Sequence, residues 1–219
     1  MKSAPKAVTA LAALAAIGAV AAPAAGAATS NSDCGNPAGS KVFSQFNDPH
    51  NYFLAPDGGF ENGGDGWALN DGATVVDGNE SFGLNSADDA KSLTLPAGSS
   101  ATSPSVCVTR HHPLFRLVAT RTVAPAAKRG DGGRATHAPA PRLKVEVIYL
   151  NGKGHKKTRT AAKLRAGDEW APTKKIAIAT GRATGRGKHK TGDVKFRFTP
   201  IGAADWQIDD VFVDPHARR

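Results

Sequence analysis

The sequence predicts an all-β protein, an antiparallel β-sandwich of about nine or ten short strands. Apolar residues alternate with polar ones in short segments bounded by glycine, proline and asparagine. In residues 143–150, for example, Leu143, Val145 and Val147 share one face. No stretch beyond residue 28 shows a sustained helical period with capping residues. The remaining chain, roughly 190 residues, is long enough for one domain with a real core.

The expected strands lie between turns and loops rich in glycine and basic residues. In chain order they are residues 52–54, 67–76, 91–95, 101–109, 114–123, 143–150, 173–180, 194–199 and 205–215. Residues 124–142, 151–165 and 181–193 are expected to be loops. The expected core consists of Trp67, Phe82, Leu93, Phe115, Leu117, Val145, Val147, Ile176, Phe196, Phe198, Trp206, Ile208 and Val211.

The closing segment, residues 205–215, reads DWQIDDVFVDP and is rich in aromatic and β-branched residues. Simple alternation places Phe212 on the same face as Trp206 and Ile208. Two adjacent acids, Asp209 and Asp210, interrupt this apolar run, so at least one is expected to point inward. A buried carboxylate needs an ion pair, hydrogen bonds or a metal. The alternative is a β-bulge or strand end that exposes both acids.

Residues 1–28 have the pattern of a signal peptide, with Lys2 and Lys6 before an Ala/Leu-rich stretch and small residues at its end. The apolar stretch is too short for a membrane span. We therefore expect a secreted, extracellular protein. Its parts would be an N-terminal segment at 29–51, a β-sandwich domain at 52–215 and a tail at 216–219.

The sequence contains two cysteines, Cys34 and Cys107. Because an exported protein meets an oxidising compartment, we expect them to form a disulfide that pins residues 29–51 to the strand around residue 107. Closing so long a loop stabilises a fold by about 4 kcal/mol in the chain-entropy account.

The net charge of +9 is unevenly distributed. Residues 29–120 contain 4 basic and 10 acidic residues, whereas residues 121–197 contain 20 basic and 5 acidic ones. Such a basic block can steer a protein to an anionic polymer, or it can simply keep a secreted domain soluble. The sequence leaves both interpretations open.

Two motifs carry a resemblance to a known family. GGFE at residues 58–61 is followed by Gly66-Trp67, and WQIDDVFV closes the domain at 206–213. The pair resembles carbohydrate-binding modules with a galactose-binding-like jelly roll, including the xylan- and glucan-binding modules of secreted bacterial hydrolases. The layout is also similar to that of small secreted actinobacterial proteins without an assigned activity. The resemblance spans residues 52–215 and implies a jelly-roll sandwich that binds polysaccharide without catalysis.

In that family a structural calcium commonly joins the opening turn to the closing strand. The resemblance implies that Glu61 and Asp209 provide carboxylates, with Gly59 as a carbonyl donor. Asp88 or Asp89 would add a carboxylate, and Lys91 its carbonyl oxygen. Calcium takes 6–8 oxygen ligands, which fits such a set. The alternative is that Glu61 and Asp209 bind backbone amides or a buried arginine.

The family holds sugars with exposed aromatic side chains on its concave sheet. Here Trp67 and Trp206 belong to the expected core, which leaves Trp170 as a half-exposed candidate. The other candidate ligand-binding residues are the charged ones opposite the core positions of the best-patterned strands, namely Arg116, Lys144, Glu146, Lys195 and Arg197. A charged face of this kind favours an acidic ligand, or no ligand, over a neutral glycan.

Together these features predict a secreted, non-catalytic binding module for an extracellular polysaccharide or an anionic cell-envelope polymer. We expect a monomer with no membrane span and no sequence-specific nucleic-acid partner. One alternative is a cell-surface structural or protein-interaction domain without a glycan ligand. A second is a hydrolase, for which the sequence shows no identifiable carboxylate pair.

Overall fold

The computed structural model describes residues 34–35, 37–122, 140–184 and 191–215, and the predicted signal peptide and C-terminal tail lie outside them. The described strands form two antiparallel sheets. Sheet I has the order β10-β7-β13-β4-β3, with β1 added to β13 and β11 added to β7. Its strands are β1 (Phe53–Leu54), β3 (Thr74–Asp77), β4 (Lys91–Leu95), β7 (Leu114–Thr122), β10 (Ala171–Pro172), β11 (Ile176–Ala177) and β13 (Asp205–Asp214).

Sheet II has the order β2-β5-β12-β8-β9, with β6 added to β12. Its strands are β2 (Ala68–Asn70), β5 (Ser100–Thr102), β6 (Val106–Thr109), β8 (Arg142–Leu150), β9 (Lys156–Leu164) and β12 (Thr191–Ile201). The described residues also form two short helices, η1 (Ser44–Phe46) and α1 (Thr180–Ala183), and neither is long and apolar enough to cross a membrane.

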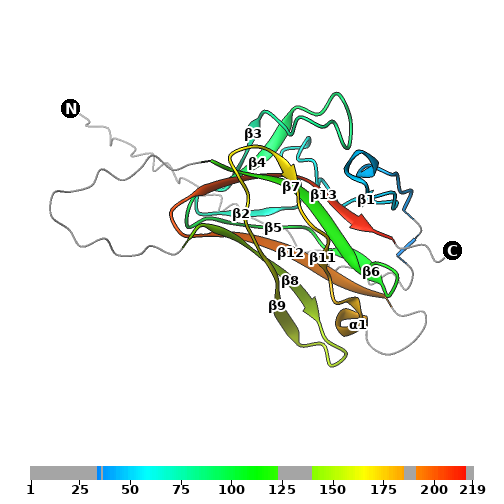
Figure 1. The fold of residues 1–219 in the computed structure, drawn as a ribbon. Helices are drawn as coiled ribbons and strands as arrows, with labels where there is room; N and C mark the ends of the chain where they lie inside the picture. The colour runs from blue at the N-terminus through cyan, green and yellow to red at the C-terminus, as the bar shows by residue number, and fades with distance from the viewer. Residues whose placement is uncertain (1–33, 36, 123–139, 185–190, 216–219) are drawn as a thin grey trace, which may run out of the picture.

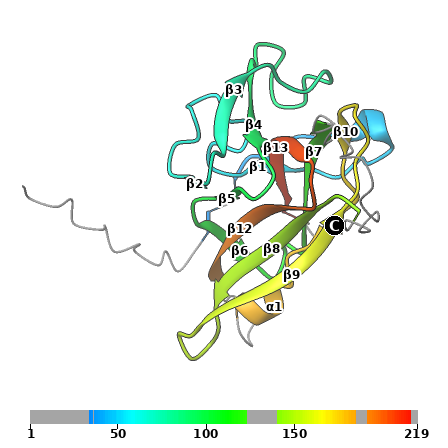
Figure 2. The same ribbon diagram turned by 90° about the vertical axis from the view of Figure 1, so that its left-hand side faces the viewer.

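The two sheets pack face to face as a jelly-roll type of β-sandwich, as the sequence predicts (Figures 1 and 2). The main core lies between them, and Phe115 of sheet I stacks on Phe196 of sheet II with ring centroids 4.2 Å apart. Every residue expected in the core is buried except Phe82, which lies half-buried in the loop between β3 and β4. The alternation of apolar residues therefore identified the inward faces of most strands.

Several predicted strands and loops are divided differently in the structure. Residues 67–76 form two strands in different sheets, because Asp71 and Gly72 adopt positive φ angles and turn the chain. Residues 101–109 likewise separate into β5 and β6, and residues 173–180 contain only the short β11 and the start of α1.

Residues 151–165 were expected to be a loop, which is wrong, because β9 forms a long hairpin with β8. The connecting turn is closed by the side chain of Asn151, whose Oδ1 accepts N–H bonds from Lys153 and His155. β9 is an edge strand that exposes several lysines, a pattern that discourages pairing with another sheet edge. Its many basic residues and weak apolar alternation are typical of a loop, which explains the wrong prediction.

Strand β13 lies at the centre of sheet I and contains a β-bulge. Its register with β7 shifts between Asp209 and Phe212, and Asp210 has a φ of 54°. One extra residue reverses the alternation, so Ile208 faces the core before the bulge and Val211 after it. Phe212 instead packs on the outer face of sheet I. The expectation that Phe212 shares a face with Trp206 and Ile208 is therefore wrong.

A second apolar cluster covers one half of the outer face of sheet I, and we call it the outer cluster. Its buried members are Phe43, Tyr52, Leu84, Val118 and Phe212, with Val42, Phe46, Leu54, Phe82 and Trp170 packed against them. The N-terminal segment therefore lies on sheet I. The predicted disulfide between Cys34 and Cys107 is confirmed, with Cα atoms 5.3 Å apart, and ties the same segment to β6.

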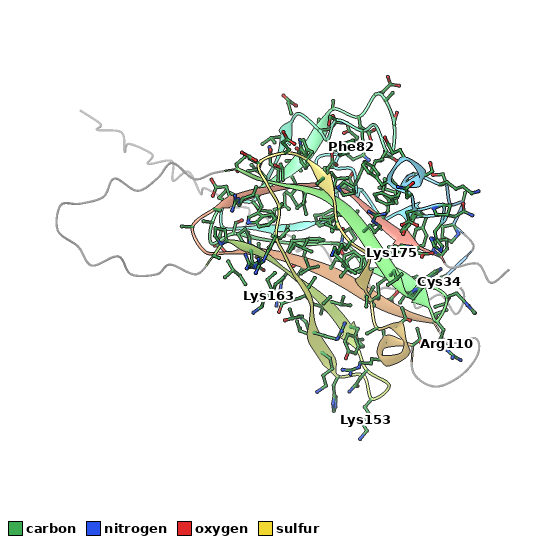
Figure 3. All side chains as sticks on the ribbon, viewed as in Figure 1. Cys34, Phe82, Arg110, Lys153, Lys163 and Lys175 are labelled. Carbon is green, nitrogen blue, oxygen red and sulfur yellow. A yellow bond between two sulfur atoms is a disulfide. The ribbon has the colours of Figure 1, made fainter. Side chains whose placement is uncertain are left out.

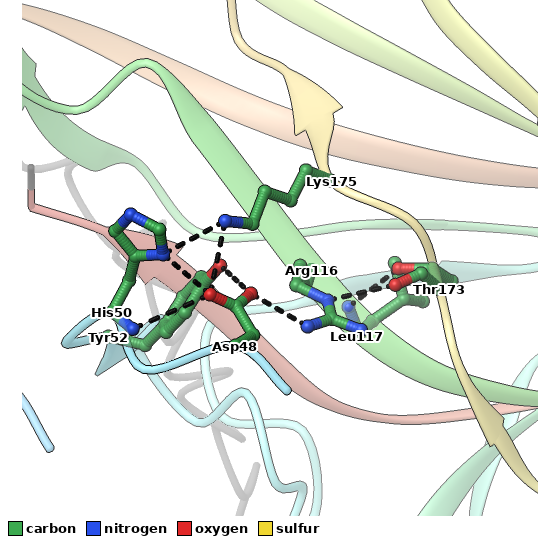
Figure 4. Close-up of polar contacts among 7 residues, drawn as sticks. All are labelled: Asp48, His50, Tyr52, Arg116, Leu117, Thr173 and Lys175. Atoms are coloured by element: carbon green, nitrogen blue, oxygen red, sulfur yellow. Dashed lines mark hydrogen bonds and ion pairs between the residues drawn. The ribbon is translucent and has the colours of Figure 1, made fainter. Parts of the chain in front are cut away.

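A buried ionic network holds the N-terminal segment on the sheet (Figure 4). Asp48 accepts hydrogen bonds from Tyr52 Oη at 2.7 Å and from Arg116 Nη1 at 2.8 Å, and Lys175 Nζ lies 3.0 Å away. Burial alone raises the pKa of Asp48, but the hydrogen bonds from Tyr52, His50, Lys175 and Arg116 outweigh it and hold that pKa well below its usual range. Asp48 is thus a buried, ionised carboxylate.

Removing the Asp48 carboxylate should destabilise the fold strongly. Asp48→Ala leaves the buried Arg116 guanidinium without its counter-charge, and breaking a buried pair in this way costs about 3–5 kcal/mol. Lys175 is about a third exposed, so Lys175→Ala should cost less than about 1 kcal/mol. Urea unfolding of both variants measures the difference, and equal losses would contradict this account of the network.

Candidate functional site

The opening turn and the closing strand meet, as the family resemblance implies. Val211 of β13 makes two backbone hydrogen bonds to this turn: its N–H donates to Gly58 O at 3.0 Å, and its carbonyl oxygen accepts from Ala55 N at 2.8 Å. A methyl group on Gly58 would lie 2.9 Å from Val211 O, so only glycine fits this close approach. The turn is therefore anchored directly on the bulge of β13.

Glu61 joins the opening turn to the segment that enters β4. Its Oε1 accepts hydrogen bonds from Ala90 N at 2.9 Å and from Lys91 N at 2.8 Å. This is the backbone-amide arrangement that the sequence left open as an alternative to calcium. Asp88 is exposed, and its N–H donates to Ser86 Oγ.

Three acids from the closing strand and the β3–β4 loop lie buried beside this turn. Asp209, Asp210 and Glu80 expose 2%, 1% and 2% of their surface. Asp209 Oδ2 accepts from Glu80 N at 3.2 Å and Asp209 Oδ1 from Asp210 N at 2.8 Å. Both acids at the bulge are thus buried, against the alternative in which a bulge exposes them. Glu80 was not anticipated, because nothing in its local sequence marks it as an interior residue.

The Glu80 carboxylate shapes the loop that follows it. It accepts hydrogen bonds from Phe82 N and from Leu84 N, the latter at 2.9 Å. The loop is therefore folded around a buried acid whose own N–H is bound to Asp209. We call Glu80, Asp89, Asp209 and Asp210 the acidic centre.

Two acids of the acidic centre, Asp209 and Asp210, have raised pKa values. Burial raises the pKa of Asp209 to about 8, against the opposing effect of its two backbone hydrogen bonds. Burial also raises the pKa of Asp210 to about 9, with added repulsion from Asp209, Glu80 and Asp89. Oδ1 of Asp210 has no hydrogen-bond partner among the described residues.

The unsatisfied oxygen of Asp210 faces the turn at Gly59. A methyl group on Gly59 would lie 3.3 Å from Asp210 Oδ1, 3.6 Å from Asn85 Nδ2 and 3.8 Å from Asp89 Oδ2. Asp89, rather than Asp88, therefore stands beside the bulge. Within the described part of the chain, no three Asp, Glu, His or Cys side chains are placed to hold a metal ion, so Glu61, Asp209 and Asp88 do not converge on one. Oxygen donors around Gly59 nevertheless match the hard ligands that calcium prefers.

A cavity of about 440 Å³ opens on the uncovered half of the outer face of sheet I. Its floor is formed by Thr120 and Thr122 of β7 and by Gln207 of β13. One wall is Ser81 and Phe82 of the β3–β4 loop, and the other comprises Asp168, Glu169 and Trp170 before β10. We call this cavity the Trp170 pocket.

The pocket combines two aromatic rings with polar groups. Trp170 and Phe82 are both half-buried, so each shows part of a ring to the cavity. Gln207 Nε2 donates to Thr94 Oγ1 at 3.3 Å, whereas the buried Thr120 hydroxyl has no partner among the described residues. Trp170 was a predicted ligand-binding residue, but Phe82 was assigned to the core, and only the folded loop reveals its place in the wall.

The other predicted ligand-binding residues lie elsewhere. Arg116 is buried under the outer cluster, where it pairs with Asp48 and lies 4.2 Å from the ring of Phe43, so it is not accessible to a ligand. Lys144, Glu146, Lys195 and Arg197 belong to β8 and β12 of sheet II. Figure 3 shows Phe82 on one side of the sandwich and Lys163 of neighbouring β9 on the other.

On sheet II these charged residues form a partly neutralised surface. Glu146 Oε2 lies 2.8 Å from Arg197 Nη2 and 3.3 Å from Lys144 Nζ. Lys163 stands directly opposite Lys144 in the β8–β9 register, and Lys195 is exposed. We call Lys144, Lys163, Lys195 and Arg197 the basic face.

Comparison with known proteins finds structural neighbours only. No family model matches the chain, and no curated protein matches it. The CBM22-1 xylan-binding domain of Xyn10C from Paenibacillus barcinonensis is 14% identical over 82% of this chain and 96% of that domain, with a TM-score of 0.44.

Two further neighbours have similar scores. A structure described as Family 16 Carbohydrate Binding Module-2 is 16% identical over 74% of this chain and 99% of its own, with a TM-score of 0.45. TmCBM61, solved with β-1,4-galactotriose, is 12% identical over 73% and 96% of the two chains, with a TM-score of 0.37. At such identities and TM-scores the similarities do not place this chain in any of these families.

The raised pKa values predict a pH-dependent stability of the metal-free protein. Between the ordinary aspartate pKa of 3.8 and the folded values of about 8 and 9, the folded state binds more protons than the unfolded state. Stability should therefore be full near pH 4 and fall as pH rises toward 9. Urea unfolding from pH 5 to 9 in chelator measures this slope. The double variant Asp209→Asn/Asp210→Asn should reduce this pH dependence of the unfolding free energy. An unchanged slope would contradict raised pKa values at these two aspartates.

Proposed function

We propose that this protein is a non-catalytic module that binds an extracellular polysaccharide in the Trp170 pocket. The observation that carries the proposal is the combination of two half-buried aromatic rings with hydrogen-bonding side chains in one cavity on a rigid sheet. Ligand sites generally combine apolar and aromatic walls with a few convergent polar groups. A sugar ring has apolar C–H faces and hydroxyl edges, so it complements such a pocket.

The polar groups of the pocket favour a neutral or cationic sugar. Asp168 and Glu169 stand in the wall, and the described lining contains no lysine or arginine. An anionic sugar would meet like charges there. The buried Thr120 hydroxyl offers a hydrogen bond that a sugar hydroxyl can satisfy in place of water.

The compartment and the lack of catalysis belong to the same proposal. A disulfide favours an oxidising, extracellular environment. Hydrolysis of a glycosidic bond generally needs two carboxyl groups that flank it. In the described lining the two carboxylates are neighbours in sequence on one wall, and the opposite wall offers only Ser81 and Phe82. This arrangement supports binding rather than cleavage.

We also propose that calcium binds at the acidic centre as a structural ion. Asp89 and Asp210 would provide carboxylates, and carbonyl oxygens of the opening turn around Gly59 would complete the set. Calcium accepts both kinds of oxygen. The support is the unpaired, buried oxygen of Asp210 beside Asp89, because an ion would satisfy it and favour the ionised acids.

A second candidate function rests on the basic face of sheet II. Lys144 and Lys163 stand directly opposite each other, and two like charges in this position repel unless an anion lies between them. In the described contacts Glu146 pairs with Lys144 and Arg197. Charge complementarity therefore favours an anionic cell-envelope polymer here. Such binding would be electrostatic and separate from the Trp170 pocket.

Trp170→Ala should weaken binding to neutral polysaccharide at least about tenfold, or ~1.4 kcal/mol. The probes are soluble xylan, β-1,4-galactan, mixed-linkage β-glucan and chitosan, measured by affinity electrophoresis and calorimetry. Trp170→Phe should retain part of the affinity because it keeps a ring. Lys163→Ala, on the opposite sheet, is the matched control and should bind as the unaltered protein does.

The same measurements separate the two candidate functions. Retention on a neutral probe should persist in added salt, whereas polygalacturonate held by the basic face should be released, because exposed charges are screened over about 8 Å at physiological ionic strength. The double variant Lys144→Ala/Lys163→Ala should then lose binding to polygalacturonate and keep binding to the neutral probe. Absence of binding to every probe would overturn both functions and favour a protein-interaction domain.

Calcium should raise the melting temperature of the unaltered protein relative to the same protein in chelator, because an ion that binds only the folded state stabilises it. Asp210→Asn and Asp89→Asn should reduce this shift. Asp88→Asn is the matched control, because Asp88 is exposed whereas the adjacent Asp89 is half-buried beside the bulge. A shift that is equal in all four proteins would contradict binding at the acidic centre.

A further inference from the structure

At one end of its floor, the Trp170 pocket borders the outer cluster. The outward-facing residues of β7 are Arg116, Val118, Thr120 and Thr122, in that order. Arg116 and Val118 are buried beneath the outer cluster, whereas Thr120 and Thr122 form the pocket floor and Thr122 is exposed. In the part of the chain that the structure describes, the outer face of the sheet therefore changes from covered to open within strand β7.

The outer cluster covers the sheet directly beside the pocket floor, and we call this side of the cluster the end wall. Phe82 packs edge-to-face on Phe46 with centroids 4.9 Å apart, and both Phe82 and Trp170 contact the cluster. The Asp48 network and the disulfide hold the N-terminal segment that builds this wall. Because its members are buried and ionically anchored, the wall is a fixed part of the fold.

The two side walls stand on opposite sides of the floor. The sheet order places β10 beyond β7 and β4 beyond β13, so Trp170 and Phe82 enter from opposite edges. The first wall is anchored by Arg121 N, which donates to Gly167 O at 2.8 Å, and by Thr173 N, which donates to Leu117 O at 2.8 Å. The second is anchored by the Glu80 carboxylate through Phe82 N and Leu84 N.

Among the described residues, the end wall and the two side walls leave one direction along the strands in which a bound chain can continue. An internal segment of a polysaccharide must leave its site in two directions, whereas a chain end leaves in one. We propose that the Trp170 pocket recognises the terminal sugars of a neutral or amino-sugar glycan chain and not its internal segments. This inference rests on the proposed polysaccharide binding and specifies which part of the polymer is bound.

Chain ends can be counted, which makes the proposal testable. Xylan, β-1,4-galactan, mixed-linkage β-glucan and chitosan are each measured intact and after partial cleavage by the matching endo-acting hydrolase. For whichever of these polymers is bound, the number of protein molecules bound per gram should double when cleavage doubles the number of chain ends. Affinity for an oligosaccharide series of the same sugar should stay constant once the pocket is filled.

Three outcomes bear on the inference. Capacity that follows the number of chain ends, and is lost in Trp170→Ala, supports it. Capacity that is unchanged by cleavage, with affinity that keeps rising along the oligosaccharide series, overturns end recognition but leaves polysaccharide binding intact. No binding to any of the four polymers, or binding that Trp170→Ala leaves unchanged, overturns the proposed use of the pocket and this inference with it.

Discussion

The β-bulge at Asp209 and Asp210 is the constraint on which the rest of the structure depends. It lies in the central strand of sheet I, where β13 changes its second partner from β4 to β1. The extra residue lets Ile208 and Val211 both face the core, while Phe212 turns outward to anchor the outer cluster. A regular strand here would turn one of these apolar groups to the wrong face.

Most strands and the core were predictable from the sequence, because alternation within a strand depends on local residue order. The reversal at the bulge was not, since it depends on a positive φ at Asp210 that aspartate adopts only when its surroundings favour it. Strand β9 was missed for another reason. An edge strand needs little apolar surface, so Lys156 and Lys163 masked a hairpin that backbone pairing with β8 defines.

The candidate sites were predictable only in part. The family resemblance implied that the opening turn meets the closing strand, and the turn does meet β13 at Gly58. Trp170 was identifiable as a half-exposed aromatic. Phe82 and Glu80 were not identifiable as site residues from the sequence. A phenylalanine is usually buried in the core, and a glutamate in a polar loop is usually exposed. Their roles arise only when the loop folds over sheet I.

Glu80 connects the two candidate sites physically. Its N–H is held by Asp209 in the acidic centre, and its carboxylate holds the amide of Phe82 in the pocket wall. The position of the aromatic wall therefore depends on the charge balance at the bulge, which is 129 positions from Glu80 in sequence but directly hydrogen-bonded to it. An ion at the acidic centre would stabilise the ionised acids and, through Glu80, keep the wall in place. The same bulge that aligns the core thus also determines the shape of the surface proposed to meet the ligand.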